Sequence, residues 1–228
     1  MTVTIVFVRH GQSTFNANHL IQGQLDKETP LDDVGVEQAT RASRAMATLH
    51  PDAVAVYSSD LSRAFDTASA IARELRMDVQ PSPLLRERHL GVLQGLPREA
   101  LARLQPEAYA AWKSRDPSID IPGGGESSLA CDARIITFMK SVVAKYPSGK
   151  KIIAVTHGGV LGRLFSRGRN AEEKRLCGMR RGVGNLAECI VCVDTSGLSW
   201  TCEYGTWASG RFLEGGHARA LEDADDVA

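Results

Sequence analysis

The chain has 228 residues, of which 43% are hydrophobic and 24% charged, and its 27 basic residues balance its 27 acidic ones. This length suits one large α/β domain or two small ones. A net charge of zero argues against a broad nucleic-acid surface, because such a surface needs an excess of basic residues. No apolar run approaches the roughly 20 residues that span a bilayer. We therefore expect a protein that binds neither nucleic acid nor a membrane.

Apolar runs typical of strands alternate with stretches of helical periodicity along the chain. Strands are expected at residues 3–8, 53–57, 152–156, 188–193 and 199–204, and helices at 33–49, 61–75, 98–113, 127–146 and 159–167. Parallel strands joined by helices bury both faces of their sheet. The alternation therefore predicts an α/β protein, a three-layer α/β/α sandwich with a mostly parallel central sheet.

No repeat or linker divides the chain, so we expect residues 1–220 to form a single domain. Residues 81–126 have less pattern and hold six of the nine prolines, which predicts a lid-like excursion over one end of the sheet. Residues 221–228 carry four acidic side chains and are expected to form a disordered, solvated tail. The five cysteines are an odd number, which favours free thiols in a reducing compartment, and hence the cytoplasm.

Cationic side chains stand where three of the expected strands end. The first apolar run ends in Arg9 and His10, and a later run ends in His157, with glycine after each histidine. Arg63 lies in the first turn of the helix that follows the second strand, where free N–H groups attract anions. Ligands of open parallel sheets collect at the carboxyl ends of the strands. We therefore expect these four residues to meet at one edge of the sheet.

These residue types point to phosphoryl transfer. Arginine presents a planar fork of donors that suits phosphate, and neutral imidazole can act as a nucleophile near neutral pH. For His10 to attack, one ring nitrogen must be free while the other donates a hydrogen bond, for which a backbone carbonyl is the expected acceptor. Glu87 stands in the excursion between two arginines and is a candidate general acid for the leaving oxygen.

The chain resembles the histidine phosphatase superfamily, in the branch related to cofactor-dependent phosphoglycerate mutase. The resemblance covers residues 3–195 and follows the order of the family's motifs. It rests on Arg9-His10-Gly11-Gln12-Ser13 with Asn16, Pro30-Leu31 with Gly35 and Gln38-Ala39, Ser58-Ser59-Asp60-Leu61-Ser62-Arg63-Ala64 with Thr67-Ala68, Glu87 with Gly91 and Gly95, Pro122-Gly123-Gly124-Gly125-Glu126-Ser127, and Val155-Thr156-His157-Gly158-Gly159. An Arg-His-Gly triplet alone is a weak signal, whereas all of these motifs in order are specific.

The resemblance implies that His10 attacks phosphorus and becomes phosphohistidine, while Arg9, Arg63 and His157 bind the phosphoryl oxygens. It also implies that Glu87 protonates the departing alcohol and then takes a proton from the attacking water. Further candidates for substrate or phosphate binding are Asn16, Gln22, Gly23, Gly158 and Asn185. Trp112, Lys113 and Arg115 either line the substrate end of the pocket or only pack against it. No metal is expected, because two arginines and a histidine supply the positive charge.

Three functions remain open. A phosphatase passes the phosphoryl group to water, a phosphoglycerate mutase returns it to another hydroxyl with 2,3-bisphosphoglycerate as primer, and an inactive member only binds. The mutases carry a longer segment after the glutamate, with adjacent arginines that hold the substrate carboxylate, and residues 109–115 lack such a pair. No residue of the catalytic set is missing. We therefore predict a phosphatase for a small phosphorylated metabolite, without a cofactor; a homodimer is one state that the sequence leaves open.

Overall fold

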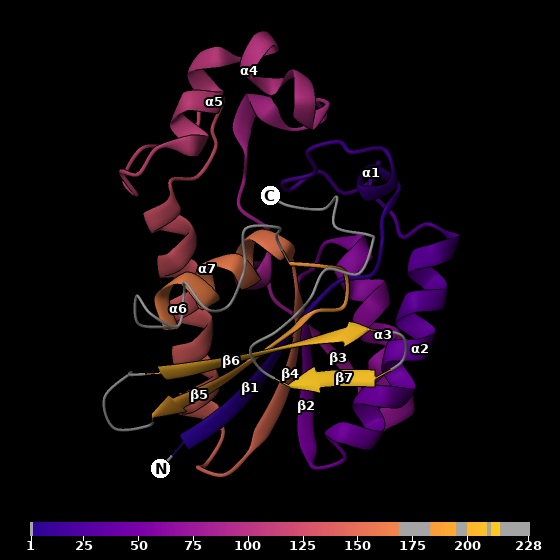
Figure 1. The fold of residues 1–228 in the computed structure, drawn as a ribbon. Coiled ribbons are helices and arrows are strands. Elements are labelled where there is room, and N and C mark those ends of the chain that lie inside the picture. Colours follow the sequence, from indigo (N-terminus) through magenta and orange to yellow (C-terminus); the bar gives the residue numbers. More distant parts are fainter. Residues whose placement is uncertain (1, 169–182, 195–199, 209–210, 215–228) are drawn as a thin grey trace.

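Figure 1 shows the computed structural model, in which helices cover both faces of one β-sheet. The structure describes residues 2–168, 183–194, 200–208 and 211–214, so the expected acidic tail lies outside the described residues. The strands are β1 (Thr2–Arg9), β2 (Ala53–Ser58), β3 (Val79–Pro81), β4 (Lys151–Thr156), β5 (Glu188–Asp194), β6 (Trp200–Ala208) and β7 (Arg211–Glu214). They form a seven-stranded sheet in the order β3-β2-β4-β1-β5-β6-β7.

The strand directions agree with the expected fold class. Strands β3, β2, β4 and β1 pair in parallel, and β5, β6 and β7 add to them by antiparallel pairs, so that β6 again runs in the direction of β1. Five of the seven strands therefore share one direction, and the predicted mostly parallel α/β/α sandwich is confirmed. In the register of β1 with β4, the last residues of the two strands, Arg9 and Thr156, lie opposite each other, and a histidine directly follows each of them.

Two pairs of helices bury the two faces of the sheet. Helices α2 (Asp33–Leu49) and α3 (Ser62–Leu75) cover one face, and α6 (Ser128–Lys145) and α7 (Gly158–Gly168) cover the other (Figure 1). Alternate side chains of a strand point to opposite faces. Accordingly, Val3, Ile5 and Phe7 of β1 join the core on the α6 side, while Val6 and Val8 join the core on the α3 side. The site-bearing strand is thus held by apolar contacts on both faces.

The excursion at residues 81–126 lies beyond the carboxyl ends of the parallel strands, with α4 (Leu101–Leu104) and α5 (Pro106–Lys113) at its far end (Figure 1). The prediction of one helix over 98–113 was wrong, because the chain breaks at Gln105, just before α5. Pro106 has no N–H to donate and excludes the α conformation from the residue before it. Single 3₁₀ turns at Pro83–Leu85, Gly91–Leu93 and Arg98–Ala100 complete the excursion.

The sequence missed the shortest elements. Strands β3 and β7 and helix α1 (Thr14–Ala17) have three or four residues each, too few to show a period. Helix α1 does carry a capping box, in which the Ser13 side chain accepts from the Asn16 N–H and the Asn16 side chain accepts from the Ser13 N–H. Within the described residues, no helix has both the length and the hydrophobicity needed to cross a membrane.

Candidate active site

His10 and His157 stand side by side at the ends of β1 and β4. Their ring centroids are 5.1 Å apart, and both rings are buried. The His10 Nδ1 lies 2.6 Å from the carbonyl oxygen of Gly11. A carbonyl can only accept, so Nδ1 carries the proton and Nε2 keeps a lone pair. Burial, with Arg63 and Arg9 nearby, holds the pKa of His10 well below its usual range, so the ring is neutral at neutral pH.

His157 is buried without a hydrogen-bond partner among the described residues. Neither of its ring nitrogens is satisfied, although buried polar groups almost always are. Burial, then Arg63 and His10, lower the pKa of His157 well below its usual range. The ring is therefore neutral, with one N–H and one lone pair available. An unsatisfied donor at this depth is what an anion-binding pocket requires.

Arg63 is the largest fully buried side chain among the described residues, and the loop after α1 anchors it. Its Nη1 donates to the Leu25 carbonyl at 2.8 Å and to the Thr29 hydroxyl at 2.7 Å, and its Nη2 donates to the Gly23 carbonyl at 2.8 Å. The Nε has no partner within the described part of the chain. Burial lowers the pKa of Arg63 to about 10. The group therefore remains cationic at neutral pH.

Arg9 completes the cationic wall. Its guanidinium is buried and donates through Nη1 to the carbonyl of Val183. A Cβ on Gly158, the first residue of α7, would lie 3.3 Å from the Arg9 Nε, which is tighter than nine in ten real Cβ contacts. A glycine here lets the guanidinium lie against the start of the helix.

Glu87 approaches the same point from the excursion. Its Oε2 accepts from the N–H of Gly159 at 2.8 Å, at the beginning of α7, and its Oε1 accepts from the N–H of Arg88 at 2.7 Å. A Cβ on Gly159 would lie 2.4 Å from the Glu87 Oε1. The second glycine after His157 therefore makes room for the carboxylate, which explains why both positions are glycine.

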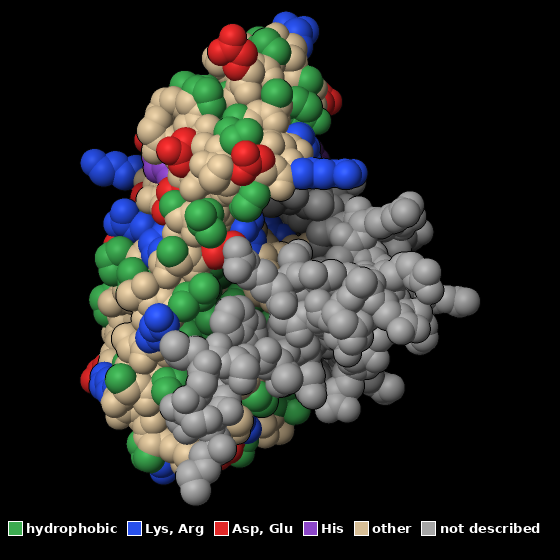
Figure 2. Space-filling view, turned by 90° about the vertical axis from the view of Figure 1, so that its left-hand side faces the viewer, with side chains coloured by type: hydrophobic (Ala, Val, Ile, Leu, Met, Phe, Trp, Pro, Cys, Tyr) green, Lys and Arg blue, Asp and Glu red, His purple; other side chains and the backbone are tan. Residues whose placement is uncertain are grey.

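These groups open into a pocket of about 470 Å³. Six basic side chains and one carboxylate, that of Glu87, line it among the described residues. Arg9 and Arg63 lie beside His10, whereas Arg88, Arg98, Lys113 and Arg163 come from the excursion and from α7. Figure 2 shows basic side chains on the surface where the excursion meets the α/β/α sandwich. We call Arg88, Arg98, Lys113 and Arg163 the distal cations.

A family comparison matches residues 5–202 to the histidine phosphatase superfamily, branch 1. The chain belongs to the histidine phosphatase superfamily. The predicted resemblance is thereby confirmed, and so is the prediction of an enzyme of this kind.

Relatives within this superfamily include both mutase-like proteins and phosphatases. Phosphoglycerate mutase-like protein 4 of Arabidopsis thaliana is 43% identical over 75% of this chain and 73% of its own. A metal-independent phosphoserine phosphatase of the same plant is 43% identical over 72% of this chain and 67% of its own. A solved mycobacterial glucosyl-3-phosphoglycerate phosphatase is 29% identical with a TM-score of 0.73, and the match covers 89% of this chain and 97% of that one.

The other predicted site residues of this histidine phosphatase superfamily member fall into two groups. Asn16, Gln22, Gly23 and Gly158 line the pocket. The Asn16 Oδ1 accepts from the Ser13 hydroxyl at 3.1 Å, and Gln22 accepts from it at 2.8 Å, which directs both amide groups. Asn185 is not among the pocket-lining residues. Its Nδ2 donates to the backbone carbonyl of His10 at 2.9 Å, so Asn185 fixes the backbone of the histidine rather than contacting the pocket.

Sequence reasoning missed three of the distal cations. Arg163 lies four residues after Gly159 and hence on the same face of α7, a signal that the helical period contained. Arg88 adjoins Glu87, but nothing local indicated that its side chain lines the pocket. Arg98 was hidden inside a helix that does not form as predicted. Of the residues left open, Trp112 and Lys113 line the pocket, and Arg115 does not.

Proposed function

We propose that this protein is a phosphatase that hydrolyses small phosphomonoesters through a phosphohistidine on His10. The observation that carries the proposal is the cluster of unsatisfied nitrogen atoms around the His10 ring. The Arg63 Nε and both ring nitrogens of His157 lack partners among the described residues. A phosphoryl group placed against the His10 Nε2 would accept from the Arg63 Nε and from the protonated ring nitrogen of His157.

The first step forms a bond between the His10 Nε2 and phosphorus and breaks the bond between phosphorus and the ester oxygen. Glu87, in its protonated form, gives its proton to that oxygen, so the alcohol leaves neutral. In the second step water attacks phosphorus, Glu87 takes a proton from the water, and the bond to Nε2 breaks. Inorganic phosphate leaves, and both side chains return to their first states.

Two arginine charges and a neutral imidazole N–H that are already in place lower the barrier for both steps. Arg9, Arg63 and His157 face the region where the phosphoryl oxygens would lie, and donors of this kind are worth most where water is excluded. The amide of Asn16 adds a neutral donor. No group of three or more His, Cys, Asp or Glu suited to a metal occurs among the described residues. The side chains themselves provide the cationic charge, and we propose that no metal takes part.

The distal cations favour a substrate with a second anionic group. Burial and Arg163 lower the pKa of Arg88, and partial burial and Arg98 lower the pKa of Lys113, so basic groups crowd one another at this end, although Asp132 pairs with Arg163. A carboxylate or second phosphate would relieve that repulsion. The named substrates of two relatives, phosphoserine and glucosyl-3-phosphoglycerate, fit this description, because both carry a carboxylate beside the phosphate. We therefore propose a small phosphorylated acid as the metabolite.

The distal cations also fit a phosphoglycerate mutase, which is the second candidate function. A bisphosphorylated primer such as 2,3-bisphosphoglycerate would place one phosphate at His10 and the other among these cations. What favours the phosphatase is the lack of adjacent arginines in residues 109–115, where the mutases hold the carboxylate of their substrate.

One assay separates these functions. The purified protein is incubated with phosphoserine, 4-nitrophenyl phosphate, and 3-phosphoglycerate with and without 2,3-bisphosphoglycerate. Release of inorganic phosphate is measured by colorimetry, and the position of the phosphoryl group by ³¹P NMR. We expect phosphate release that the His10→Ala variant loses. Conversion of 3-phosphoglycerate to its 2-isomer without phosphate release would identify a mutase, and no turnover of any compound would identify a binding protein.

We also propose that the protein works in the cytoplasm. Cys131 is a buried free thiol, and burial raises its pKa to about 12. Such thiols suit a reducing compartment. A homodimer stays a prediction, which sedimentation of the purified protein would test.

A further inference from the structure

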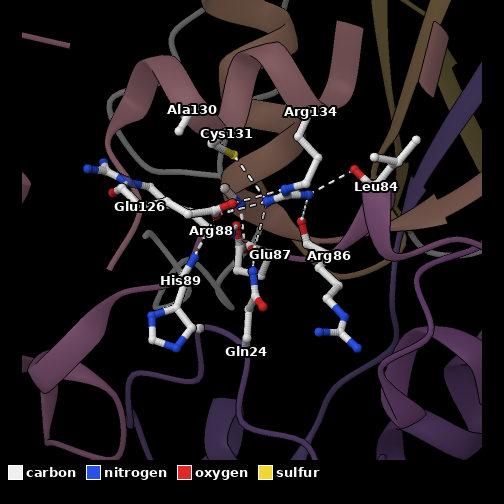
Figure 3. Close-up of polar contacts among 12 residues, drawn as sticks. Gln24, Leu84, Arg86, Glu87, Arg88, His89, Glu126, Ala130, Cys131 and Arg134 are labelled. Atoms are coloured by element: carbon white, nitrogen blue, oxygen red, sulfur yellow. Dashed lines mark hydrogen bonds and ion pairs between the residues drawn. The ribbon is translucent and has the colours of Figure 1, made fainter. Parts of the chain in front are cut away.

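Arg134 of α6 holds the chain segment that carries Glu87, and Figure 3 shows its contacts. We propose that Arg134, together with Glu126, is a positioning residue for the acid Glu87. The role rests on the proposed function, because it assumes that Glu87 exchanges a proton with the substrate. Neither residue lines the pocket, so any effect on the reaction must pass through the backbone that they hold.

The backbone around Glu87 has no regular structure of its own to fix it. The 3₁₀ turn Pro83–Leu85 ends before Glu87, and the 3₁₀ turn Gly91–Leu93 begins only after it. Four consecutive carbonyls are tied to side chains instead. Arg134 Nη1 donates to those of Leu84 and Arg86, both at 2.8 Å, and Arg134 Nη2 donates to that of Glu87 at 3.2 Å. The remaining carbonyl, of Leu85, accepts from the Thr156 hydroxyl at 2.7 Å.

Glu126 fixes Arg134 in turn. The two side chains form a bidentate ion pair, Nε to Oε1 at 3.0 Å and Nη2 to Oε2 at 2.9 Å. Such fork-to-fork pairs add geometric specificity to the energy of the ion pair. Burial disfavours the charge most, but the hydrogen bonds to Glu126, together with the charges of Glu126 and Glu87, outweigh it and raise the pKa of Arg134. The guanidinium is therefore charged and oriented before substrate arrives.

Glu126 also ties down the chain on the other side of Glu87. Its Oε2 accepts from the N–H of His89 at 2.9 Å, and its own N–H donates to the His89 carbonyl at 2.8 Å. Its backbone carbonyl accepts from the Arg88 Nε at 2.9 Å. Glu87 is thus bracketed by Arg134 before and at its own position and by Glu126 after it. Gln24 adds one contact, to the Glu87 carbonyl at 2.9 Å.

The bracket holds the carboxylate where it meets the N–H of Gly159. A displacement of about 1 Å at a reacting group can cost about a hundredfold in rate. Loss of the bracket should therefore weaken proton transfer to the leaving group and leave nucleophilic attack by His10 in place. A good leaving group needs no proton, so the two effects can be separated by the choice of substrate.

The test compares kcat/KM for benzyl phosphate, whose alkoxide must be protonated, with kcat/KM for 4-nitrophenyl phosphate, whose phenolate leaves unaided. Complete removal of a general acid costs about 10²- to 10⁴-fold. For Arg134→Met we expect a loss of about 10- to 100-fold on benzyl phosphate and less than about threefold on 4-nitrophenyl phosphate, a part of the general-acid effect. Glu126→Gln should also lower kcat/KM more for benzyl phosphate than for 4-nitrophenyl phosphate, but the difference should be smaller than for Arg134→Met. Should Arg134→Met fail to fold, Glu126→Gln decides.

Two further variants serve as the positive and the negative control. Glu87→Gln should show the largest difference between the substrates; equal losses on both would overturn the acid role of Glu87 and this proposal with it. Lys151→Met removes an ion pair with Asp52 far from the pocket and should leave both rates unchanged. Suppose that Glu87→Gln lowers kcat/KM more for benzyl phosphate than for 4-nitrophenyl phosphate, but that Arg134→Met and Glu126→Gln lower both values equally or leave both unchanged. The bracket then only supports the fold, and the positioning role is wrong.

Discussion

The two ends of the pocket are built in different ways. At the phosphate end, His10 and His157 follow directly from two paired strands, and Arg63 stands in the first turn of a helix packed on the same sheet. At the distal end, Arg98 and Lys113 come from short turns and helices joined by irregular chain. The phosphate end is fully buried, whereas Lys113 is exposed.

This difference indicates that the two ends of the pocket have different roles in the reaction. Groups fixed by a sheet and shielded from water can stabilise developing charge without reorganising, which is what a chemical step requires. Groups on an exposed, irregular segment contribute less energy each, because solvent screens them, but they can select among substrates. We therefore expect changes at the phosphate end to lower kcat and changes at the distal end to alter KM for particular substrates.

Among the variants that compare the two ends of the pocket, Arg63→Ala should have the largest effect. Arg63→Ala removes a buried cation from the phosphoryl site, and the loss of one such donor costs about 10²- to 10³-fold in kcat. It also frees the carbonyls of Gly23 and Leu25, so the melting temperature should fall as well. Steady-state kinetics on 4-nitrophenyl phosphate, with circular dichroism to establish folding, measure both. A folded variant with a near-normal kcat would remove Arg63 from the reaction.

A smaller and selective effect is expected at Lys113. Lys113→Met keeps the length of the side chain but removes a distal cation. We expect KM for phosphoserine to rise about tenfold, the equivalent of 1.4 kcal/mol, while KM for 4-nitrophenyl phosphate changes little. Arg115→Met is the matched control, because Arg115 lies two residues away but does not line the pocket. A uniform change on both substrates would show that the distal cations do not select for a second anion.

The last effect concerns stability rather than rate, and it belongs to the phosphate end alone. The pKa values of His10 and His157 lie well below the ordinary 6.5 in the folded protein. As the pH falls below 6.5, the unfolded chain takes up protons that the folded protein does not, and folding loses stability. The dependence approaches roughly 1 kcal/mol per pH unit for each histidine as the pH falls below 6.5, and neither histidine contributes well above that pH.

Urea unfolding at several pH values between 7.5 and 5 measures this dependence. We expect the free energy of unfolding to fall more steeply for the wild-type protein than for His157→Gln, which removes one of the two titrating groups. Added inorganic phosphate should oppose the loss, since it binds only the folded protein. Equal slopes for the two proteins would mean that His157 is not held neutral in the folded state.

The same contrast explains how far the sequence could predict the molecule. The ends of parallel strands meet wherever the sheet forms, so Arg9, His10, Arg63 and His157 could be placed together from local patterns alone. The excursion depends on a separate small core around Leu93 and Leu101, whose contacts join distant parts of the chain. No periodicity specifies such packing, and the break before Pro106 removed the one helix expected there.

The roles of supporting residues were equally beyond local patterns. Asn185 was predicted in the pocket, but it donates to the backbone of His10. Arg134 lies within a helix whose prediction was accurate, yet its bonds to three carbonyls of the excursion required the tertiary structure. Residue type and spacing predict which side chains react, while the contacts that hold them depend on how separate segments pack.

The central claim is that His10 carries the phosphoryl group, and trapping the intermediate tests it most directly. The enzyme is mixed with 4-nitrophenyl phosphate, quenched in alkali within milliseconds, digested, and analysed by mass spectrometry under conditions that preserve phosphohistidine. We predict a phosphoryl group on His10, and none in the His10→Ala variant, which should also lose turnover. A phosphoryl group on another residue, or normal turnover by His10→Ala, would contradict the account.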